Sequence, residues 1–456
     1  MSKAMPIWNV KQFGAAGDGT ADDTIAIQSA CDASEGGGTV YIPPGSYRIT
    51  RKIDVRHDHT TLLGEGIQSH LIYEYEQGPE DEDPTASLFV FRDGIQGAAV
   101  RELKLEYIGS FYGQVGESYA GKVSALRFSQ CQDVIVDHME ICGFNDSAVK
   151  LATGDESKYA ERFRVSRCHL HHNRVAGVLF GYVDGISIAD CDLTHHGSPL
   201  DGGTGYGCAG SSLEKPRNVQ IIGNRASYNY RKGIDLHAGV GAVIANNICH
   251  ANRLYGIYAE GCKTGNVTIT GNIISGMNRQ SLDIGEPYTW IMGIDFGPYC
   301  ESLAPDDYYN FIIEGNQIVD FGLEEGDAYP FNCYYNMARG NIIIRNNIVT
   351  GGRITHLVRM NSIVDADGDR RVQVNITGNQ VDVESCAKEL FYMPCIDQLV
   401  MTGNQIELRD SERGGSVNAS SVEWILCEGL ERLKRESRAY FSGNFMNGRL
   451  ASFEKG

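Results

Sequence analysis

Short runs of β-branched and other apolar residues recur along the chain, and many of them end in Gly-Asn or Asn-Asn. These runs are VQIIGN ending at Asn224, AVIANN at Asn247, VTITGN at Asn272, FIIEGN at Asn316, IIIRNN at Asn347, VNITGN at Asn379, LVMTGN at Asn404 and AYFSGN at Asn444. The first two intervals are 23 and 25 residues (247 − 224 and 272 − 247), and longer intervals fit the same unit with inserted loops. Runs of this length and composition predict strands.

Two upstream runs carry the same pattern with cysteine in the asparagine position, FRVSRC ending at Cys168 and ISIADC ending at Cys191. A period near two dozen residues with short strands predicts a solenoid, because each turn is too small to bury its own apolar face. Asparagine suits a tight bend, so the stacked turns should form an asparagine ladder. A leucine-rich horseshoe is disfavoured because its LxxLxL frame is absent. The pattern therefore predicts a parallel β-helix.

The N-terminal segment differs from the repeats. Thr20 and Asp23 stand in capping-box spacing before IAIQSACDA, which predicts a helix that covers the open first turn. We expect residues 1–50 to form this cap and the first turns, and residues 51–456 to form the body of one continuous domain. The expected inserted loops lie at about residues 73–84, 110–122, 198–215, 279–310 and 321–340.

Composition narrows the class of protein. The 456 residues include 54 glycines and are 42% hydrophobic and only 21% charged, which favours strands and turns over charged helices. The net charge of −18 argues against a nucleic-acid partner. The start of the chain lacks a secretory signal pattern, and no apolar run is long enough to span a bilayer. We therefore expect no membrane partner, and a protein that is cytoplasmic, virion-associated or exported by a non-Sec route.

Neither the cysteines nor the histidines predict a metal site. The 13 cysteines are scattered singly without CxxC pairs, so we expect small buried side chains and not disulfides or zinc ligands. The LHHN and THHG turns lack a metal-binding frame. Calcium binding by the acidic loop YEYEQGPEDEDP at residues 73–84 would lack a defined ligand spacing, so no cofactor is expected.

Candidate catalytic residues emerge when the second strands of successive turns are aligned. The segments are AGVLFG (176–181), KGIDLHA (232–238), YGIYAEG (255–261) and MGIDFGP (292–298). Alternation directs five polar side chains away from the packed interior: Asp235, His237, Tyr258, Glu260 and Asp295. Turns stack about 4.8 Å apart, which places Asp235 beside Tyr258, Asp295 one turn beyond, and His237 beside Glu260. Outward polar residues are expected on any solenoid strand, but five on adjacent turns favour an active site.

Two chemistries fit this patch. Paired carboxylates can serve as glycosidase acid and base or nucleophile, whereas His237 and Tyr258 could remove and return a proton at sugar C5. Lyase or epimerase chemistry also needs cations for a substrate carboxylate, and long loops with aromatic side chains suit sugar rings. The candidate substrate-binding residues are Arg231, Lys232, Arg253, Tyr230, His196, Trp290 and Tyr288.

NVKQFGAAGDGTADDTIAIQSACD, GGGTVYIPPGSYRI and the V-x-I-x-G-N repeats together resemble the pectate-lyase-like superfamily of right-handed β-helices. The branch in question holds mannuronan C5-epimerases, rhamnogalacturonase-like enzymes and phage tailspike depolymerases. The resemblance implies an all-β, single-stranded right-handed parallel β-helix that acts on polysaccharides. Asp235 and His237 match the Tyr-Gly-Phe-Asp-Pro-His motif of the epimerases, and Glu260 matches their later acid. Leu236 replaces the motif's Pro and Lys232 its Tyr, and the second departure counts against the epimerase reaction.

The leading prediction is a carbohydrate-active enzyme that cleaves glycosidic bonds of a poly- or oligosaccharide, as a glycoside hydrolase using Asp235, Glu260 and Asp295. The first alternative is a polyuronate lyase or C5-epimerase centred on His237 and Tyr258. The second is a non-catalytic, glycan-binding β-helix like a phage or prophage tailspike. Because many tailspikes trimerise, we expect a monomer or a homotrimer.

Overall fold

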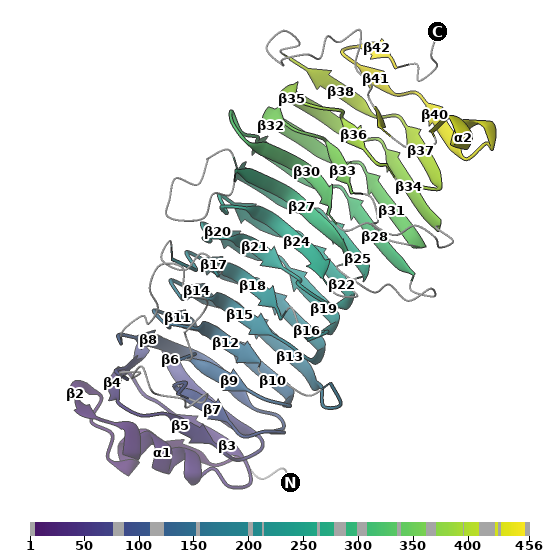
Figure 1. Ribbon diagram of the computed structural model, residues 1–456. Helices are drawn as coiled ribbons and strands as arrows, with labels where there is room; N and C mark the ends of the chain where they lie inside the picture. Colours follow the sequence, from purple (N-terminus) through teal and green to yellow (C-terminus); the bar gives the residue numbers. More distant parts are fainter. Residues whose placement is uncertain are drawn as a thin grey trace. The chain divides into compact units, whose positions relative to one another are not determined.

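The computed structural model is built almost entirely of short parallel strands (Figure 1). Three helical elements accompany them: η1 (Val10–Phe13), α1 (Thr24–Asp32) and α2 (Leu430–Arg435). The structure describes residues 5–75, 86–109, 123–151, 156–198, 204–211, 214–261, 265–277, 289–298, 308–334, 339–361, 371–394, 396–409, 425–426 and 430–451. Each strand pairs with the equivalent strand of the next turn, so the predicted parallel β-helix is confirmed.

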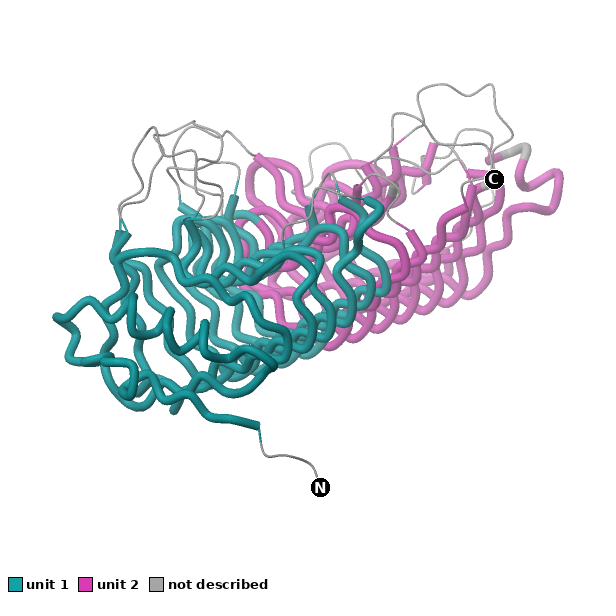
Figure 2. Tube along the Cα trace, turned by 90° about the horizontal axis from the view of Figure 1, so that it is seen from below, with its two compact units in different colours: residues 1–231, 283–286 teal, residues 232–282, 287–456 magenta. Residues whose placement is uncertain are grey.

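The chain divides into two compact units, where the sequence led us to expect one continuous domain (Figure 2). Unit 1 comprises residues 1–231 and 283–286, and unit 2 comprises residues 232–282 and 287–456. Each unit contains strands of two kinds of parallel sheet, which we call the large and the small sheet.

The strands of unit 1 are as follows. In the large sheet they are β1 (Ile7–Asn9), β2 (Asp18–Asp22), β3 (Gly38–Tyr41), β4 (Gly45–Ile49), β6 (Thr60–Tyr73), β8 (Ala99–Tyr107), β10 (Gln132–Asp137), β11 (Glu140–Cys142), β13 (Ala160–Ser166), β14 (His169–His171), β16 (Val183–Ala189), β17 (Asp192–Thr194), β19 (Arg217–Ile222) and β20 (Arg225–Ser227). In the small sheet they are β5 (Ile53–Val55), β7 (Phe89–Phe91), β9 (Leu126–Phe128), β12 (Ser147–Leu151), β15 (Ala176–Phe180) and β18 (Tyr206–Gly210).

The strands of unit 2 repeat this arrangement. In the large sheet they are β22 (Val240–Ala245), β23 (Ile248–His250), β25 (Gly265–Thr270), β26 (Ile273–Met277), β28 (Tyr309–Glu314), β29 (Gln317–Phe321), β31 (Arg339–Arg345), β32 (Ile348–Ile354), β34 (Arg371–Thr377), β35 (Gln380–Cys386), β37 (Gln398–Thr402), β38 (Gln405–Leu408), β40 (Ala439–Ser442), β41 (Phe445–Met446) and β42 (Arg449–Leu450). In the small sheet they are β21 (Lys232–Asp235), β24 (Tyr255–Gly261), β27 (Trp290–Pro298), β30 (Asp327–Cys333), β33 (Val358–Met360), β36 (Phe391–Tyr392) and β39 (Ile425–Leu426). The pair β41–β42 is an antiparallel hairpin.

Helix α1 lies in the N-terminal segment, as predicted, but the expected capping box does not form. Thr20 belongs to strand β2, and the side chain of Asp23 accepts from the backbone N–H groups of Ala16 and Gly17 instead of capping the helix. Asp22 accepts from the N–H of Thr24 at 3.0 Å. The preceding turn therefore uses the carboxylate that the sequence pattern assigned to the helix.

The predicted asparagine ladder runs through unit 2. The side-chain oxygen of Asn316 accepts from the backbone N–H of Asn272 at 3.0 Å and from its amide at 2.9 Å. The Asn316 amide in turn donates to the carbonyl of Ile269 at 2.9 Å and to the side-chain oxygen of Asn347 at 3.0 Å. The same pattern joins Asn347, Asn379, Asn404 and Asn444. Each rung satisfies buried groups of the bend, so the ladder holds consecutive turns in register.

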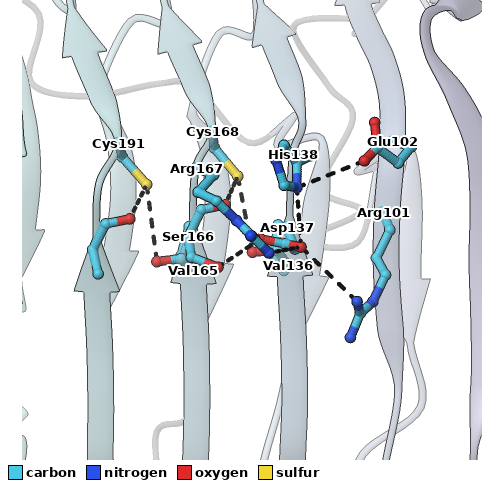
Figure 3. Close-up of polar contacts among 11 residues, drawn as sticks. Arg101, Glu102, Val136, Asp137, His138, Val165, Ser166, Arg167, Cys168 and Cys191 are labelled. Carbon is cyan, nitrogen blue, oxygen red and sulfur yellow. Dashed lines mark hydrogen bonds and ion pairs between the residues drawn. The ribbon is translucent and has the colours of Figure 1, made fainter.

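In unit 1 the two cysteines of the repeat take over part of this role (Figure 3). The thiols of Cys191 and Cys168 lie 3.9 and 3.8 Å from the carbonyls of Val165 and Val136 on the turn before. Their nearer acceptors are the carbonyls of Ala189 at 3.2 Å and of Ser166 at 3.1 Å on their own turns. The amide of Asn224 donates to the equivalent carbonyl one turn later, that of Ile188, at 2.9 Å. A thiol therefore replaces an amide as a weaker donor in the same position.

Asp137 fixes the neighbouring corner of unit 1 (Figure 3). It accepts hydrogen bonds from Ser166 at 2.7 Å and from Arg167 at 2.6 and 3.0 Å. Burial alone would raise the pKa of Asp137, but these bonds outweigh it and lower the pKa to about 2. The ion pair crosses from one turn to the next and is structural.

Three of the expected loops contain strands of the small sheet. Strand β18 lies within residues 198–215, β27 within 279–310 and β30 within 321–340. Nearly all of their described side chains are buried, so these strands lack the inside–outside alternation that marks a strand in the sequence. The expected loops at 73–84 and 110–122 lie largely outside the described residues.

The nine cysteines that the structure describes are buried free thiols. Among the described residues, no helix has the length and apolar character that a membrane crossing requires.

We predict that Asn316→Ala lowers the free energy of unfolding by about 3 kcal/mol, because buried donors and acceptors of two neighbouring turns lose their partners. Asn310→Ala is the matched control, since Asn310 hydrogen-bonds Asn266 and Asn341 near the surface and should cost less than about 1 kcal/mol. Urea denaturation measures both values. Equal losses of unfolding free energy in the two variants would show that a ladder asparagine stabilises the protein no more than a surface asparagine does.

Candidate active site

The small-sheet strands of unit 2 stack five polar residues into one row. The register pairs Asp235 with Tyr258, Tyr258 with Asp295, Asp295 with Asn332, and Asn332 with Arg359. The first two pairings are those that the strand alignment predicted. The inserted segment between β24 and β27 does not break the register.

A pocket of about 570 Å³ lies over these strands. Its size is that of a small-molecule site. Both aromatic side chains and carboxyl groups line it. The lining residues are His237, Tyr255, Tyr258, Glu260, Trp290, Met292, Asp295, Asp327, Tyr329, Tyr334 and Arg359.

Asp235 lies outside this lining, although the sequence made it a central residue. Its carboxylate is 1% exposed and pairs with the ammonium group of Lys232 at 3.0 Å and with Nδ1 of His237 at 3.6 Å. Burial pushes the pKa of Asp235 upward, but Lys232 and His237 outweigh it, so the net shift is downward. Asp235 is therefore an ionised support whose partner His237 lines the pocket with its side chain 32% exposed.

Lys232 connects this support to the aromatic wall. Its ammonium group lies 3.4 Å from the ring centroid of Tyr258 and 5.1 Å from that of Tyr255. The ring of His237, which follows strand β21, packs against the ring of Tyr258, and the two ring centroids are 5.2 Å apart. Burial, together with the nearby Glu260 and Asp295, strongly raises the pKa of Tyr258, so its phenol keeps its proton at neutral pH.

Glu260 and Asp295 are two carboxyl groups that line the same pocket, and the charge of Asp295 acts on Glu260. Burial and the charge of Asp295 raise the pKa of Glu260 well above its usual value. Burial also raises the pKa of Asp295 to about 6, against the hydrogen bonds that it receives from Glu260 and from Asn332, the latter at 2.7 Å. The pair therefore holds one shared proton at neutral pH, with Glu260 the neutral member.

The far wall contains residues that the sequence reasoning missed as site residues. The guanidinium group of Arg359 lies 4.6 Å from the ring centroid of Tyr329 and 5.5 Å from that of Tyr334. Asp327 accepts a hydrogen bond from Thr355 at 3.1 Å. Arg359 and Asp327 lie on strands without the Gly-Ile-Asp pattern, and only the inter-turn register could have found them.

Several predicted substrate-binding residues lie elsewhere. His196 belongs to unit 1 and is 1% exposed. Its backbone N–H donates to the side-chain oxygen of Asn229, and its ring Nδ1 accepts from the backbone N–H of Asn173. It therefore occupies a ladder position and does not line a groove. Tyr230 and Arg231 also belong to unit 1, and Arg253 does not line the pocket. Tyr288 lies outside the described residues, whereas Trp290 lines the pocket.

The His, Cys, Asp and Glu side chains in the described part of the chain do not form a metal centre. No group of three or more His, Cys, Asp or Glu side chains there converges in a geometry that could hold a metal ion. Within the buried pair Glu260–Asp295, the carboxylate of Asp295 already accepts a hydrogen bond from the Asn332 amide at 2.7 Å.

Comparisons with known proteins agree with this architecture. Residues 7–81 match the family model described as rhamnogalacturonase A/epimerase, pectate lyase-like, and residues 124–289 match the model described as right handed beta helix region. The chain therefore has the right-handed β-helix fold, and its N-terminal segment is similar to the pectate lyase-like family, as the sequence motifs indicated.

The curated relatives include mannuronan C5-epimerase AlgE5 of Azotobacter vinelandii, 27% identical over 310 residues that cover 65% of this chain and 25% of the relative. Alginate lyase 7 of the same organism is 25% identical over 251 residues, 55% of this chain and 23% of the relative. The chain thus spans about a quarter of the length of these relatives. Gene product 12 of bacteriophage phi29 shares the fold, with a TM-score of 0.64 at 15% identity over 98% of this chain and 58% of that protein.

We predict that Lys232→Met lowers the free energy of unfolding by about 3–5 kcal/mol, because it removes the principal cation beside a buried carboxylate. Lys232→Met combined with Asp235→Leu should recover most of this loss, since neither charge is then left uncompensated. Chemical denaturation of the wild type, both single variants and the double variant gives the coupling energy. Additive losses would contradict the ion pair.

Proposed function

We propose that the pocket of unit 2 binds an acidic polysaccharide and catalyses proton transfer at C5 of a uronate residue, as a polyuronate lyase or C5-epimerase does. The observation that carries this proposal is the position of His237, which lines the pocket while its Nδ1 lies 3.6 Å from the buried carboxylate of Asp235. The sequence alone favoured hydrolysis, and this supported imidazole is the reason for preferring the alternative.

A hydrolase needs two carboxyl groups that act separately, about 5–5.5 Å apart when it retains configuration and about 6.5–9.5 Å apart when it inverts. In this pocket Glu260 and Asp295 instead hold one proton between them at neutral pH. Asp235 cannot replace one of them, because its carboxylate is sealed beneath the pocket with Lys232. The pair behaves as one proton-holding unit.

In the proposed reaction His237 is the base. Asp235 engages Nδ1, which leaves Nε2 for the substrate and stabilises the imidazolium that forms. Nε2 takes the proton from C5, and the electron pair of the broken C–H bond moves into the carboxylate as an enolate.

The enolate needs neutral or positive groups around the substrate carboxylate. Glu260 supplies a neutral carboxyl donor, and Asp295 becomes a second one if it also takes up a proton. Arg359 lines the same pocket and supplies a positive charge. Binding of an anionic sugar next to the pair raises the pKa of Asp295 further and so favours this uptake.

Two outcomes then differ only in the fate of the enolate. Expulsion of the oxygen at C4 gives a cleaved chain with an unsaturated uronate, which is the lyase reaction. Return of a proton to the opposite face of C5 gives epimerisation, and the phenol of Tyr258, which carries its proton at neutral pH, lines the same pocket as the candidate donor. The relatives named mannuronan C5-epimerase and alginate lyase support the same pair of outcomes.

Hydrolysis remains a second candidate because of Asp327. This carboxylate lines the same pocket, and Glu260 has the raised pKa of a general acid. Glu260 and Asp327 would then replace the trio that the sequence suggested. The product analysis separates the two candidates.

The deciding experiment incubates the protein with polymannuronate, polyguluronate, polygalacturonate and neutral glucans, in water and in deuterium oxide. Unsaturated ends support the lyase, and deuterium at C5 of an uncleaved chain supports the epimerase. Saturated reducing ends with added water would overturn the proposal in favour of hydrolysis. Binding without any product would mean a non-catalytic glycan-binding protein.

We predict that His237→Gln lowers kcat by about 10²–10⁴-fold on the active polyuronate, since it removes the general base. The change leaves the Glu260–Asp295 pair in place, so KM should change little. Steady-state kinetics measures both constants, and a variant with His250→Gln is the matched control because His250 lies on the large sheet. Full activity of His237→Gln would remove this residue from the mechanism.

We predict that affinity for the uronate chain falls about tenfold per pH unit above pH 6, because binding takes up one proton. The sign follows from the raised pKa of Asp295, which is protonated below about pH 6 and ionised above it. Asp295→Asn is permanently neutral and should bind with little pH dependence. Isothermal titration calorimetry in buffers of different ionisation enthalpy counts the protons. Wild-type affinity independent of pH between 6 and 8 would contradict the prediction.

A further inference from the structure

A second cavity of about 610 Å³ lies on the large-sheet strands β32, β35 and β38 of unit 2. None of its lining residues is shared with the pocket of the candidate active site. Ile348 stands in the same exposed row as Gln380, whereas Val381 and Ile406 are buried between the exposed residues of their strands. The hairpin β41–β42 contributes Phe445 and Gly448. Strand β41 pairs parallel with β38, and β42 pairs antiparallel with β41.

Two rows of hydrogen-bonding side chains cross the cavity. Gln380 pairs in register with Gln405, and Asp382 with Glu407. Adjacent strands repeat every ~4.8 Å, so amides and carboxylates stand side by side at one-turn spacing. All four side chains are exposed, and the rows offer both donors and acceptors to a ligand.

The charges of the cavity select against an anion. Asp382 and Glu407 are acidic, and the neighbouring Arg409 already pairs with Asp382 at 2.9 Å and donates to the carbonyl of Gly351 at 2.6 Å. The ring of Phe445 is 42% exposed and offers a flat apolar face. Hydroxyl groups match such rows of amides and carboxylates, and the apolar face of a sugar ring matches an aromatic side chain.

We infer that this cavity is a second, non-catalytic site that binds a neutral oligosaccharide. A polyuronate would place its carboxylates against Asp382 and Glu407, so the site differs in ligand class from the pocket proposed for proton transfer. The inference does not depend on the reaction in that pocket.

The experiment measures binding of neutral gluco-, manno- and galacto-oligosaccharides of four to six units by isothermal titration calorimetry, with an oligouronate of the same length for comparison. The test variant is Gln380→Ala with Gln405→Ala, and Phe445→Ala is tested separately. The matched control is Gln317→Ala, an exposed glutamine in the same row of the sheet that does not line the cavity. Glu260→Gln tests the other pocket.

We expect the Kd for at least one neutral oligosaccharide to rise about tenfold or more in the double glutamine variant and in Phe445→Ala. Gln317→Ala and Glu260→Gln should bind as the wild type does. Binding that is lost in Glu260→Gln and kept in the double variant would place the ligand in the active-site pocket and overturn the inference. The inference would also be overturned if none of the neutral sugars bound, or if the oligouronate bound at this cavity equally well. Self-association in sedimentation experiments that Phe445→Ala abolishes would overturn it too.

Discussion

Inter-turn hydrogen bonding is the constraint on which the rest of the structure depends. In a parallel β-helix the backbone groups of one turn find their partners on the turns before and after it, so a slip of one residue would turn the interior side chains outward. The asparagine ladder opposes such a slip at the bend, because each side chain of the ladder bonds both the backbone and the amide of its neighbour. Where thiols replace amides, as at Cys168 and Cys191, the sulfur atoms still lie near the equivalent carbonyls.

The candidate active site follows from the same register. Asp235 and Arg359 are 124 positions apart (359 − 235), yet they belong to one row of five strands. Stacking polar residues at one strand spacing forces their charges together, and the protein resolves this crowding in two ways. Lys232 neutralises Asp235 below the pocket, whereas Glu260 and Asp295 share a proton within it. The first solution fixes a charge, and the second makes the charge of the pocket depend on pH.

Much of this architecture was readable from the sequence, for physical reasons that also explain the failures. Strands with a polar outer face and an asparagine at the bend can be recognised from their regular spacing along the sequence. The shared Gly-Ile-Asp pattern aligned Asp235 with Asp295 correctly. Strand β30 was taken for a loop because it is buried along its whole length and has no alternation. Arg359 and Asp327 were not predicted as site residues, because the residues that they contact in the pocket come from other turns of the chain. His196 was predicted to bind the substrate. Burial instead lowers its pKa to about 3 and keeps the ring neutral, as its position in the ladder requires. Burial and hydrogen-bond partners of this kind are properties of packing, not of spacing.

The acidity of the chain bears on how it would hold an anionic sugar. With a net charge of −18, long-range attraction cannot draw in a polyuronate, and Arg359 is the one guanidinium among the residues that line the described pocket. A site built from added lysines and arginines would need each new cation to be packed and paired. A carboxyl pair that titrates near neutral pH can serve the same purpose with a proton, because uptake of that proton removes negative charge from the pocket that we propose binds a uronate. Lys232 in place of the motif's tyrosine fits this arrangement, since it keeps Asp235 ionised and leaves the shared proton to Glu260 and Asp295.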